Sequence, residues 1–151
     1  MKKMLNLQFD DRVRLVGINL KQKKVKPGGF FTIEYAWHVT GVVDNTDWKI
    51  FVHVDGNGKR FGADHHGVGG LYPMKKWPKG KYVTYEQKVS IPKEVKAANA
   101  GIWIGVFDEQ AHKAGHKVRM KVTNDRKKLK FRMGSDGRVE IGNIEITGRK
   151  G

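Results

Sequence analysis

The chain has 151 residues, enough for one domain with a sizeable buried core. Thirty Lys and Arg against fifteen Asp and Glu give a formal net charge of +15, which attracts polyanions such as nucleic acid, acidic polysaccharide, lipid head groups and acidic proteins. The chain contains no cysteine, which excludes a disulfide scaffold, a thiol nucleophile and a cysteine-ligated metal centre, and its many aromatic residues argue against intrinsic disorder.

Alternation of apolar and polar residues predicts strands along most of the chain. In chain order, the expected strands span residues 12–20, 30–40, 48–55, 59–64, 82–91, 101–108, 117–122, 128–133 and 138–147. Gly-rich turns are expected at 55–58 and 134–137, because Gly and Asn supply the positive φ that tight turns need. Residues 65–80 form a long loop in this prediction, and residues 93–99 form one helical turn.

Eight or nine short strands without a long helix predict an all-β sandwich in a single domain over residues 1–151, with its core between about 9 and 147. No segment approaches the roughly 20 apolar residues of a membrane span. The first residues lack the apolar stretch of a signal peptide. The sequence therefore leaves two interpretations open, a cytoplasmic protein and a processed piece of a longer exported one.

Several short motifs occur in a distinctive order: Phe51-Val52-His53, the turn at 55–58, Tyr72-Pro73, a Trp-x-x-Gly at 77–80 and Gly105-Val106-Phe107-Asp108. In this order and spacing they resemble the β-sandwich domain at the extracytoplasmic end of bacterial and archaeal membrane glycosyltransferases of the dolichyl-phosphate-mannose mannosyltransferase type, which also occurs in other envelope proteins. The resemblance covers residues 9 to 147. It implies an immunoglobulin-like antiparallel sandwich, an extracytoplasmic location and a non-catalytic role.

Histidines and one aspartate offer a candidate metal site. His38 and His53 both lie opposite the apolar stripe of their strands, so they become neighbours if those strands pair. The other candidate ligands follow one hairpin later and can reach the same surface; they are Asp64, His65 and His66. The alternative is structural: His53 is a half-buried sheet residue, and the two adjacent histidines hold the Gly-rich loop. We favour this alternative and expect no cofactor.

Enzymatic motifs are absent from the sequence. Neither Ser90 nor Ser135 lies in the Gly-x-Ser-x-Gly pattern of a nucleophile elbow. The glycines at 67–70 are not followed by a predicted helix, so they do not indicate a phosphate-binding loop. We therefore expect a protein without catalytic residues.

Two aromatic residues of the long loop stand among lysines, an arrangement that can stack a sugar ring or a base while the ammonium groups meet an anion. The candidate ligand-binding residues are Tyr72, Lys75, Lys76, Trp77, Lys79 and Lys81. In the alternative, the loop folds its rings over the end of the sandwich and closes the core, which we favour for Trp77. The tryptophans at 37, 48 and 103 are expected in the core.

A basic run at 117–138 carries nine Lys or Arg. The sequence has no aromatic pair of the kind that an RNA-recognition sheet shows, so the nucleic-acid hypothesis rests on charge alone. The leading hypothesis is a non-enzymatic binding or accessory module of the cell envelope, whose partner is an anionic polysaccharide or an envelope protein. The alternative is a nucleic-acid-binding protein that acts through nonspecific backbone electrostatics. The oligomeric state is not predicted.

Overall fold

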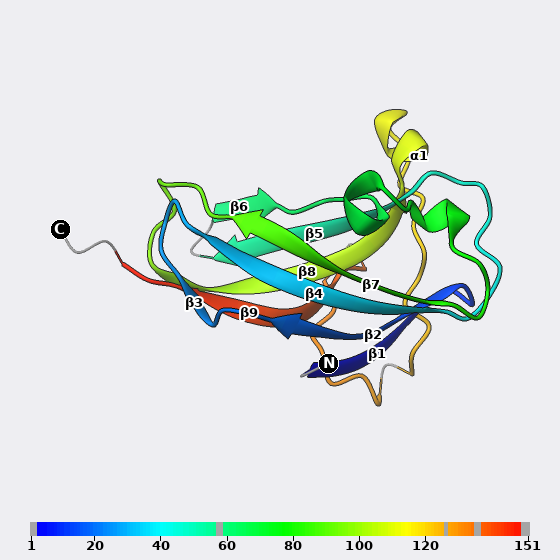
Figure 1. Ribbon diagram of the computed structural model, residues 1–151, viewed down its shortest axis with the longest axis horizontal. Coiled ribbons are helices and arrows are strands. Elements are labelled where there is room, and N and C mark those ends of the chain that lie inside the picture. The colour runs from blue at the N-terminus through cyan, green and yellow to red at the C-terminus, as the bar shows by residue number, and fades with distance from the viewer. Residues whose placement is uncertain (1–2, 57–58, 126, 135–136, 149–151) are drawn as a thin grey trace.

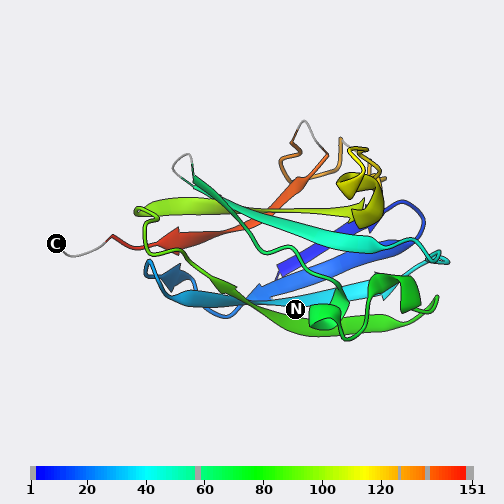
Figure 2. The same cartoon turned by 90° about the horizontal axis from the view of Figure 1, so that it is seen from above.

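The computed structural model describes residues 3–56, 59–125, 127–134 and 137–148, and it shows two β-sheets packed face to face (Figures 1 and 2). One sheet has the strand order β1-β2-β4-β7 and the other β3-β9-β8-β5-β6. The strands are β1 (Lys3–Phe9), β2 (Val13–Leu20), β3 (Lys24–Val25), β4 (Phe30–Val39), β5 (Trp48–Gly56), β6 (Lys59–Gly62), β7 (Tyr82–Ser90), β8 (Ala98–Asp108) and β9 (Val139–Ile146). The predicted all-β sandwich is confirmed.

The helical elements are short. Two 3-10 turns, η1 (Gly67–Gly70) and η2 (Met74–Lys76), lie in the long loop, and α1 (Glu109–Lys113) follows β8. The side chain of Asp108 caps α1 by accepting hydrogen bonds from the backbone N–H groups of Gln110 and Ala111. Among the described residues no helix is long and apolar enough to cross a membrane.

Some predicted elements are wrong. Strand β1 was not expected, and β3 pairs with β9 in parallel, so the sandwich is not wholly antiparallel. The predicted helical turn at 93–99 is replaced by a turn at 93–94 and the start of β8. The segments 117–122 and 128–133 form isolated bridges instead of strands. Asn57, Gly58, Ser135 and Asp136, which belong to the two predicted turns, lie outside the described residues.

Alternation on β4 builds the centre of the core. The buried residues of its inward face are Phe31, Ile33, Tyr35, Trp37 and Val39. They face the inward residues of the other sheet, and burial of each large apolar side chain contributes about 1.5–3 kcal/mol to folding. The residues between them, including His38, point to the outer surface of the four-stranded sheet.

A bulge in β2 shifts its alternation. The register with β4 slips between Leu15 and Gly17, so the next inward side chain is that of Ile18. The simple alternation expected for residues 12–20 therefore holds only up to Leu15.

The segment at 117–134 closes one side of the sandwich. Its first part bonds to β1, where the N–H of Thr123 donates to the carbonyl of Gln8, and its last part bonds to β9, where the N–H of Glu140 donates to the carbonyl of Arg132. The segment thus runs along the open side between the two sheets, and it brings Arg119 next to β8 and Arg132 next to β9.

Candidate functional site

Trp77 closes one end of the core. Its side chain is 2% exposed, and its ring packs 5.9 Å from that of Trp37. Its indole N–H donates to the carbonyl of Tyr72 at 2.8 Å. The loop approaches the ring so closely that a Cβ on Gly67 would lie 2.6 Å from Cζ2 of Trp77. A ring held in this way is not available to stack on a ligand, and it takes the structural role that we favoured.

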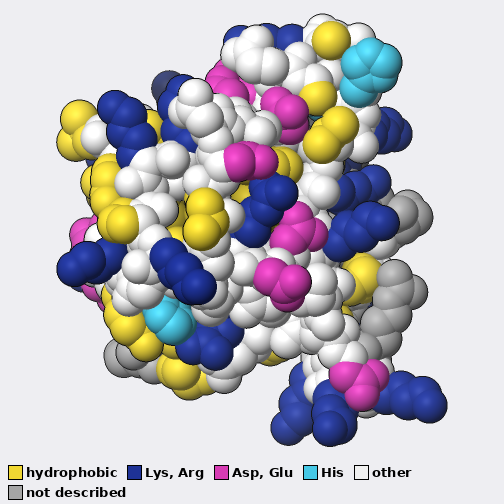
Figure 3. All heavy atoms as spheres, turned by 90° about the vertical axis from the view of Figure 1, so that its right-hand side faces the viewer, with side chains coloured by type: hydrophobic (Ala, Val, Ile, Leu, Met, Phe, Trp, Pro, Cys, Tyr) yellow, Lys and Arg dark blue, Asp and Glu magenta, His cyan; other side chains and the backbone are white. Residues whose placement is uncertain are grey.

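The loop lysines do not converge on an aromatic ring. Lys75 lies 4.0 Å from a carboxylate oxygen of Asp47, while Lys76, Lys79 and Lys81 are exposed. Figure 3 views the end of the sandwich that carries η1 and η2, and it shows acidic, basic and apolar side chains interspersed. With Tyr72 half-buried, the predicted ligand-binding residues share a loop without forming one basic site.

The structure separates the histidines of the metal hypothesis. Their strands, β4 and β5, belong to different sheets and do not pair. His38 therefore lies on the outer face of the four-stranded sheet, and His53 lies on the outer face of the five-stranded one. Asp64 accepts a hydrogen bond from the backbone N–H of Val52 at 2.8 Å, and burial raises the pKa of its carboxyl group. The five predicted residues therefore do not meet at one point.

His65 is a buried structural residue. Its Nδ1 lies 3.0 Å from the carbonyl of Ala63, and its Nε2 lies 2.6 Å from the hydroxyl of Tyr85. A carbonyl can only accept, so Nδ1 carries the proton and Nε2 accepts from Tyr85. Burial lowers the pKa of His65 to about 4, which keeps the ring neutral. Both nitrogens are occupied, and neither is free for a metal ion.

His66 stands with Asp47 and Glu109 in the one group of potential metal ligands that the described residues bring within 4.8 Å of one another. Lysines already neutralise this group: Lys49 and Lys113 lie 3.0 and 3.2 Å from the carboxylate of Glu109. The hydrogen bond from Lys49 is the main reason that the pKa of Glu109 falls to about 2. A cation would have to displace these ammonium groups, so the geometry favours an ion-pair network.

The outer face of the five-stranded sheet carries arginines stacked on aromatic rings. The guanidinium of Arg138 lies 4.8 Å from the ring centroid of Phe107, and that of Arg119 lies 5.4 Å from the same centroid. The Phe107 ring meets Phe51 edge-on at 4.7 Å. Arg132 lies 5.6 Å from the ring of Trp103. We call this surface the arginine face; its residues are Phe51, Trp103, Phe107, Arg119, Arg132 and Arg138.

The local backbone explains why these side chains meet. Phe51 on β5 stands opposite Gly105 on β8, and Phe107 forms an isolated bridge with Arg119. A Cβ on Gly105 would lie 2.8 Å from the Phe107 ring and 3.2 Å from Cγ of Arg138. The missing side chain of Gly105 therefore leaves the space in which Arg138 lies over the two phenylalanines.

Positive charge is concentrated on this face. Burial is the main cause that lowers the pKa of Arg138. The nearby charges of Arg60 and Arg119 lower it further, while the charge of Asp64 raises it. Burial and then Arg138 lower the pKa of His53. Arg119 makes no ion pair with a described residue, while Arg132 lies 4.0 Å from Glu140. Several positive charges therefore lie close together on this face.

The arginine face is not among the sites predicted from the sequence. Trp103 is predicted in the core, but its side chain lies on the outer face opposite His53 and Glu140 and is partly exposed. Phe51 gave a usable signal, because it is an aromatic residue at an outward position of its strand. The basic run at 117–138 was noticed, but its contact with Phe107 depends on the fold.

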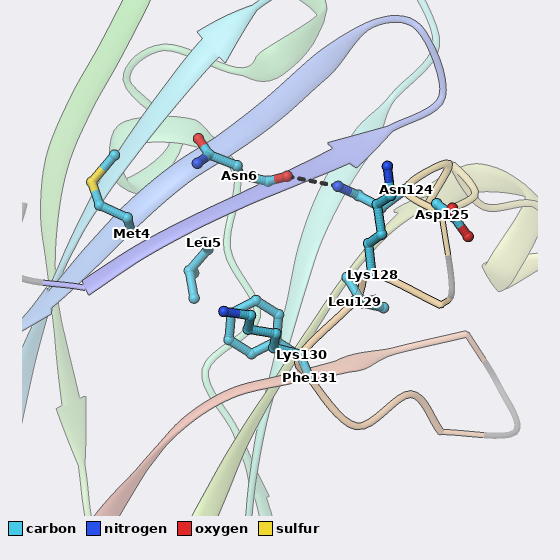
Figure 4. Close-up of a pocket in the computed structure, with 9 residues that line it drawn as sticks. All are labelled: Met4, Leu5, Asn6, Asn124, Asp125, Lys128, Leu129, Lys130 and Phe131. Carbon is cyan, nitrogen blue, oxygen red and sulfur yellow. Dashed lines mark hydrogen bonds between the residues drawn. The ribbon is translucent and has the colours of Figure 1, made fainter.

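A hollow of about 330 Å³ lies between β1 and the segment at 117–134 (Figure 4). Asn124 connects its two walls: its side chain accepts from the N–H of Gln8 and donates to the carbonyl of Asn6, each at 2.8 Å. The wall residues also include Leu5, Leu129 and Phe131. These contacts fasten the segment that begins near Arg119 to the edge of the four-stranded sheet.

The sequence matches no protein-family model and shows no significant similarity to a curated protein.

Proposed function

We propose that the protein is a non-enzymatic module that binds an anionic polysaccharide on its arginine face. The observation that carries the proposal is the stacking of Arg119 and Arg138 on one ring, that of Phe107. The ring fixes the orientation of the guanidinium above it, and guanidinium N–H groups are the donors that bind carboxylate, sulfate or phosphate oxygens in charge-assisted hydrogen bonds. Preorganised donors of this kind bind anions with less loss of side-chain entropy.

The accessibility of the rings favours a glycan over nucleic acid. Sheets that bind single-stranded nucleic acid offer open aromatic rings to the bases. Phe51 and Phe107 are each only 6% exposed, and guanidinium groups lie over them. This face therefore offers charge-assisted hydrogen bonds in place of base stacking, which suits the acidic groups of a polysaccharide.

The resemblance to the extracytoplasmic sandwich domain supports the rest of the proposal. It implies a location in the cell envelope, an immunoglobulin-like strand arrangement and a role without catalysis, and the proposal adopts these three expectations. Acidic polysaccharides are abundant polyanions on cell surfaces, so the location and the charge of +15 agree with the same ligand class.

Titration calorimetry with an oligogalacturonate, a heparin oligosaccharide and a single-stranded oligothymidylate tests the proposal. The double variant Arg119→Gln/Arg138→Gln is expected to lose about tenfold or more in glycan affinity, because each guanidinium makes charge-assisted hydrogen bonds. The control Lys26→Gln/Lys96→Gln removes the same charge from exposed positions elsewhere and is expected to bind nearly as tightly as the wild type.

Two outcomes contradict the proposal. Equal losses in both double variants would mean that only the net charge matters. Tighter binding of the oligothymidylate, with a steep loss of affinity as salt rises, would favour the nucleic-acid alternative, because each neutralised phosphate releases counterions.

A further inference from the structure

A row of polar and aromatic side chains crosses the outer face of the other, four-stranded sheet. Arg14 on β2 stands directly opposite His38 on β4, and His38 stands opposite Tyr82 on β7. All three lie on the outward side of their strands. We call them the outer row. The row lies on the sheet opposite the arginine face, and none of its members takes part in that face.

The aromatic members of the row form an exposed stack. The rings of His38 and Tyr82 are nearly parallel, at 6°, with their centroids 4.2 Å apart. Tyr82 begins β7, which is an edge strand, and it is 66% exposed. His38 covers one face of the phenol ring, and most of the remaining surface is open to solvent. An open ring at a sheet edge offers a platform for the C–H face of a sugar.

Arg14 supplies a cation at the other end of the row. Its Nη2 lies 3.2 Å from Nδ1 of His38. Because a guanidinium can only donate, Nδ1 accepts, and the neutral imidazole keeps its proton on Nε2. Arg14 makes no ion pair with any residue in the described part of the chain. The outward carboxylate of Glu34 is four residues from His38 along β4, about 13 Å away.

We propose that the outer row is a second binding site, for an acidic oligosaccharide that lies across β7, β4 and β2. One sugar stacks on Tyr82, and the carboxylate of a hexuronate unit pairs with Arg14. Two strand spacings of about 4.8 Å separate these residues, so the ligand must be longer than one sugar ring. The ligand class rests on the proposed function, while the site rests on separate residues.

Two sites on opposite faces make the molecule bivalent. A long acidic polysaccharide that occupies the arginine face of one molecule and the outer row of another would be cross-linked by the protein. The wild type is therefore expected to raise light scattering when mixed with long polygalacturonate, and a variant of either site is expected to bind the polymer without cross-linking it.

The site is tested in the Arg119→Gln/Arg138→Gln background, in which the remaining binding of a galacturonate octamer reports on the outer row. There, Tyr82→Ala and Arg14→Gln are each expected to reduce the affinity about tenfold. Tyr82→Phe keeps the ring and is expected to bind as the background protein does. Lys88→Gln removes one exposed charge from the other end of the same strand and serves as the charge control.

The outcomes separate the two proposals. If the background protein no longer binds the octamer, the outer row is refuted and the arginine face stands. If Tyr82→Ala and Arg14→Gln lower the affinity but Arg119→Gln/Arg138→Gln does not, the proposed function on the arginine face fails. Equal binding of the fully methyl-esterified octamer would refute the pairing of a carboxylate with Arg14. Preference for an oligothymidylate would mean that Tyr82 stacks on a base, and it would overturn the assignment of a sugar ligand.

Discussion

His65 shows how one buried polar residue holds a loop against a sheet. Its two ring nitrogens contact Ala63 in its own loop and Tyr85 on β7. Gln87 adds a second connection, because its amide donates to the carbonyl of Ala63 at 2.7 Å. A buried network in which every group is paired stabilises one arrangement, whereas loss of one partner leaves a costly unpaired group.

The stability of the protein is expected to fall when His65 is protonated. Burial lowers its pKa from the ordinary value of 6.5 to about 4. The unfolded chain therefore binds the proton first as the pH decreases, and the contribution of neutral His65 is complete above pH 6.5 and lost towards pH 4. The loss amounts to about 3 kcal/mol.

Urea denaturation between pH 4 and 8 measures this effect. His65→Gln is expected to flatten the pH dependence of the free energy of unfolding, and His112→Gln, at an exposed position, is expected to leave it unchanged. The same slope in all three proteins would show that other groups cause it.

The arrangement of the arginine face is expected to depend on the absence of a side chain at Gly105. In Gly105→Ala, the new Cβ would lie 2.8 Å from Phe107, so the ring and Arg138 must shift. We expect a loss of glycan affinity and of about 1–3 kcal/mol of stability. Gly62→Ala is the control, because a Cβ there meets nothing within 4 Å. Unchanged binding by Gly105→Ala would show that the position of Arg138 does not matter.

At the scale of elements, Trp77 is a further anchor of the long loop between β6 and β7, besides His65. Trp77 fills the end of the core between the loop and Trp37. Trp77→Ala is therefore expected to cost about 3–5 kcal/mol in the free energy of unfolding. Leu71→Ala in the same loop is expected to cost almost nothing, because Leu71 is 87% exposed. Thermal melting of both variants checks this, and a nearly neutral Trp77→Ala would mean that the ring does not close the core.

The elements also show what alternation can predict. The inward and outward residues of β4 follow the predicted pattern, because this central strand has one buried face along its whole length. Alternation was equally present in β1, where Leu5, Leu7 and Phe9 are buried, but the prediction did not use it. The segment at 117–133 alternates too, yet its described residues form only isolated bridges, with Phe9, Phe107 and Val139.

The candidate site, like the strands, could be predicted from the sequence only in part. The outward position of Phe51 could be derived from its strand. The meeting of Arg119 and Arg138 on Phe107 could not, because it depends on how the segment between them crosses the side of the sandwich. The burial of Trp77 was the alternative favoured from the sequence, since a Trp-Pro loop can close an open end of a sandwich, and Trp77 is buried.

For the molecule as a whole, the charge of +15 is divided among surfaces with different chemistry. Several cations are neutralised locally, as Lys49 and Lys113 are by Glu109, and the end that carries η1 and η2 has mixed charge (Figure 3). The arginine face combines cations with rings that orient them. A positive net charge steers polyanions toward the molecule, and the arginine face is expected to decide where they bind.

The most direct test of this account follows the arginine Nε–Hε resonances of the ¹⁵N-labelled protein during titration with an oligogalacturonate. The account predicts that the resonances of Arg119 and Arg138 shift in a saturable manner, with the same dissociation constant as the backbone amides around Phe107. Shifts that are confined to the loop at 64–81, or that do not saturate anywhere on the five-stranded sheet, would contradict the assignment of the arginine face as the binding site.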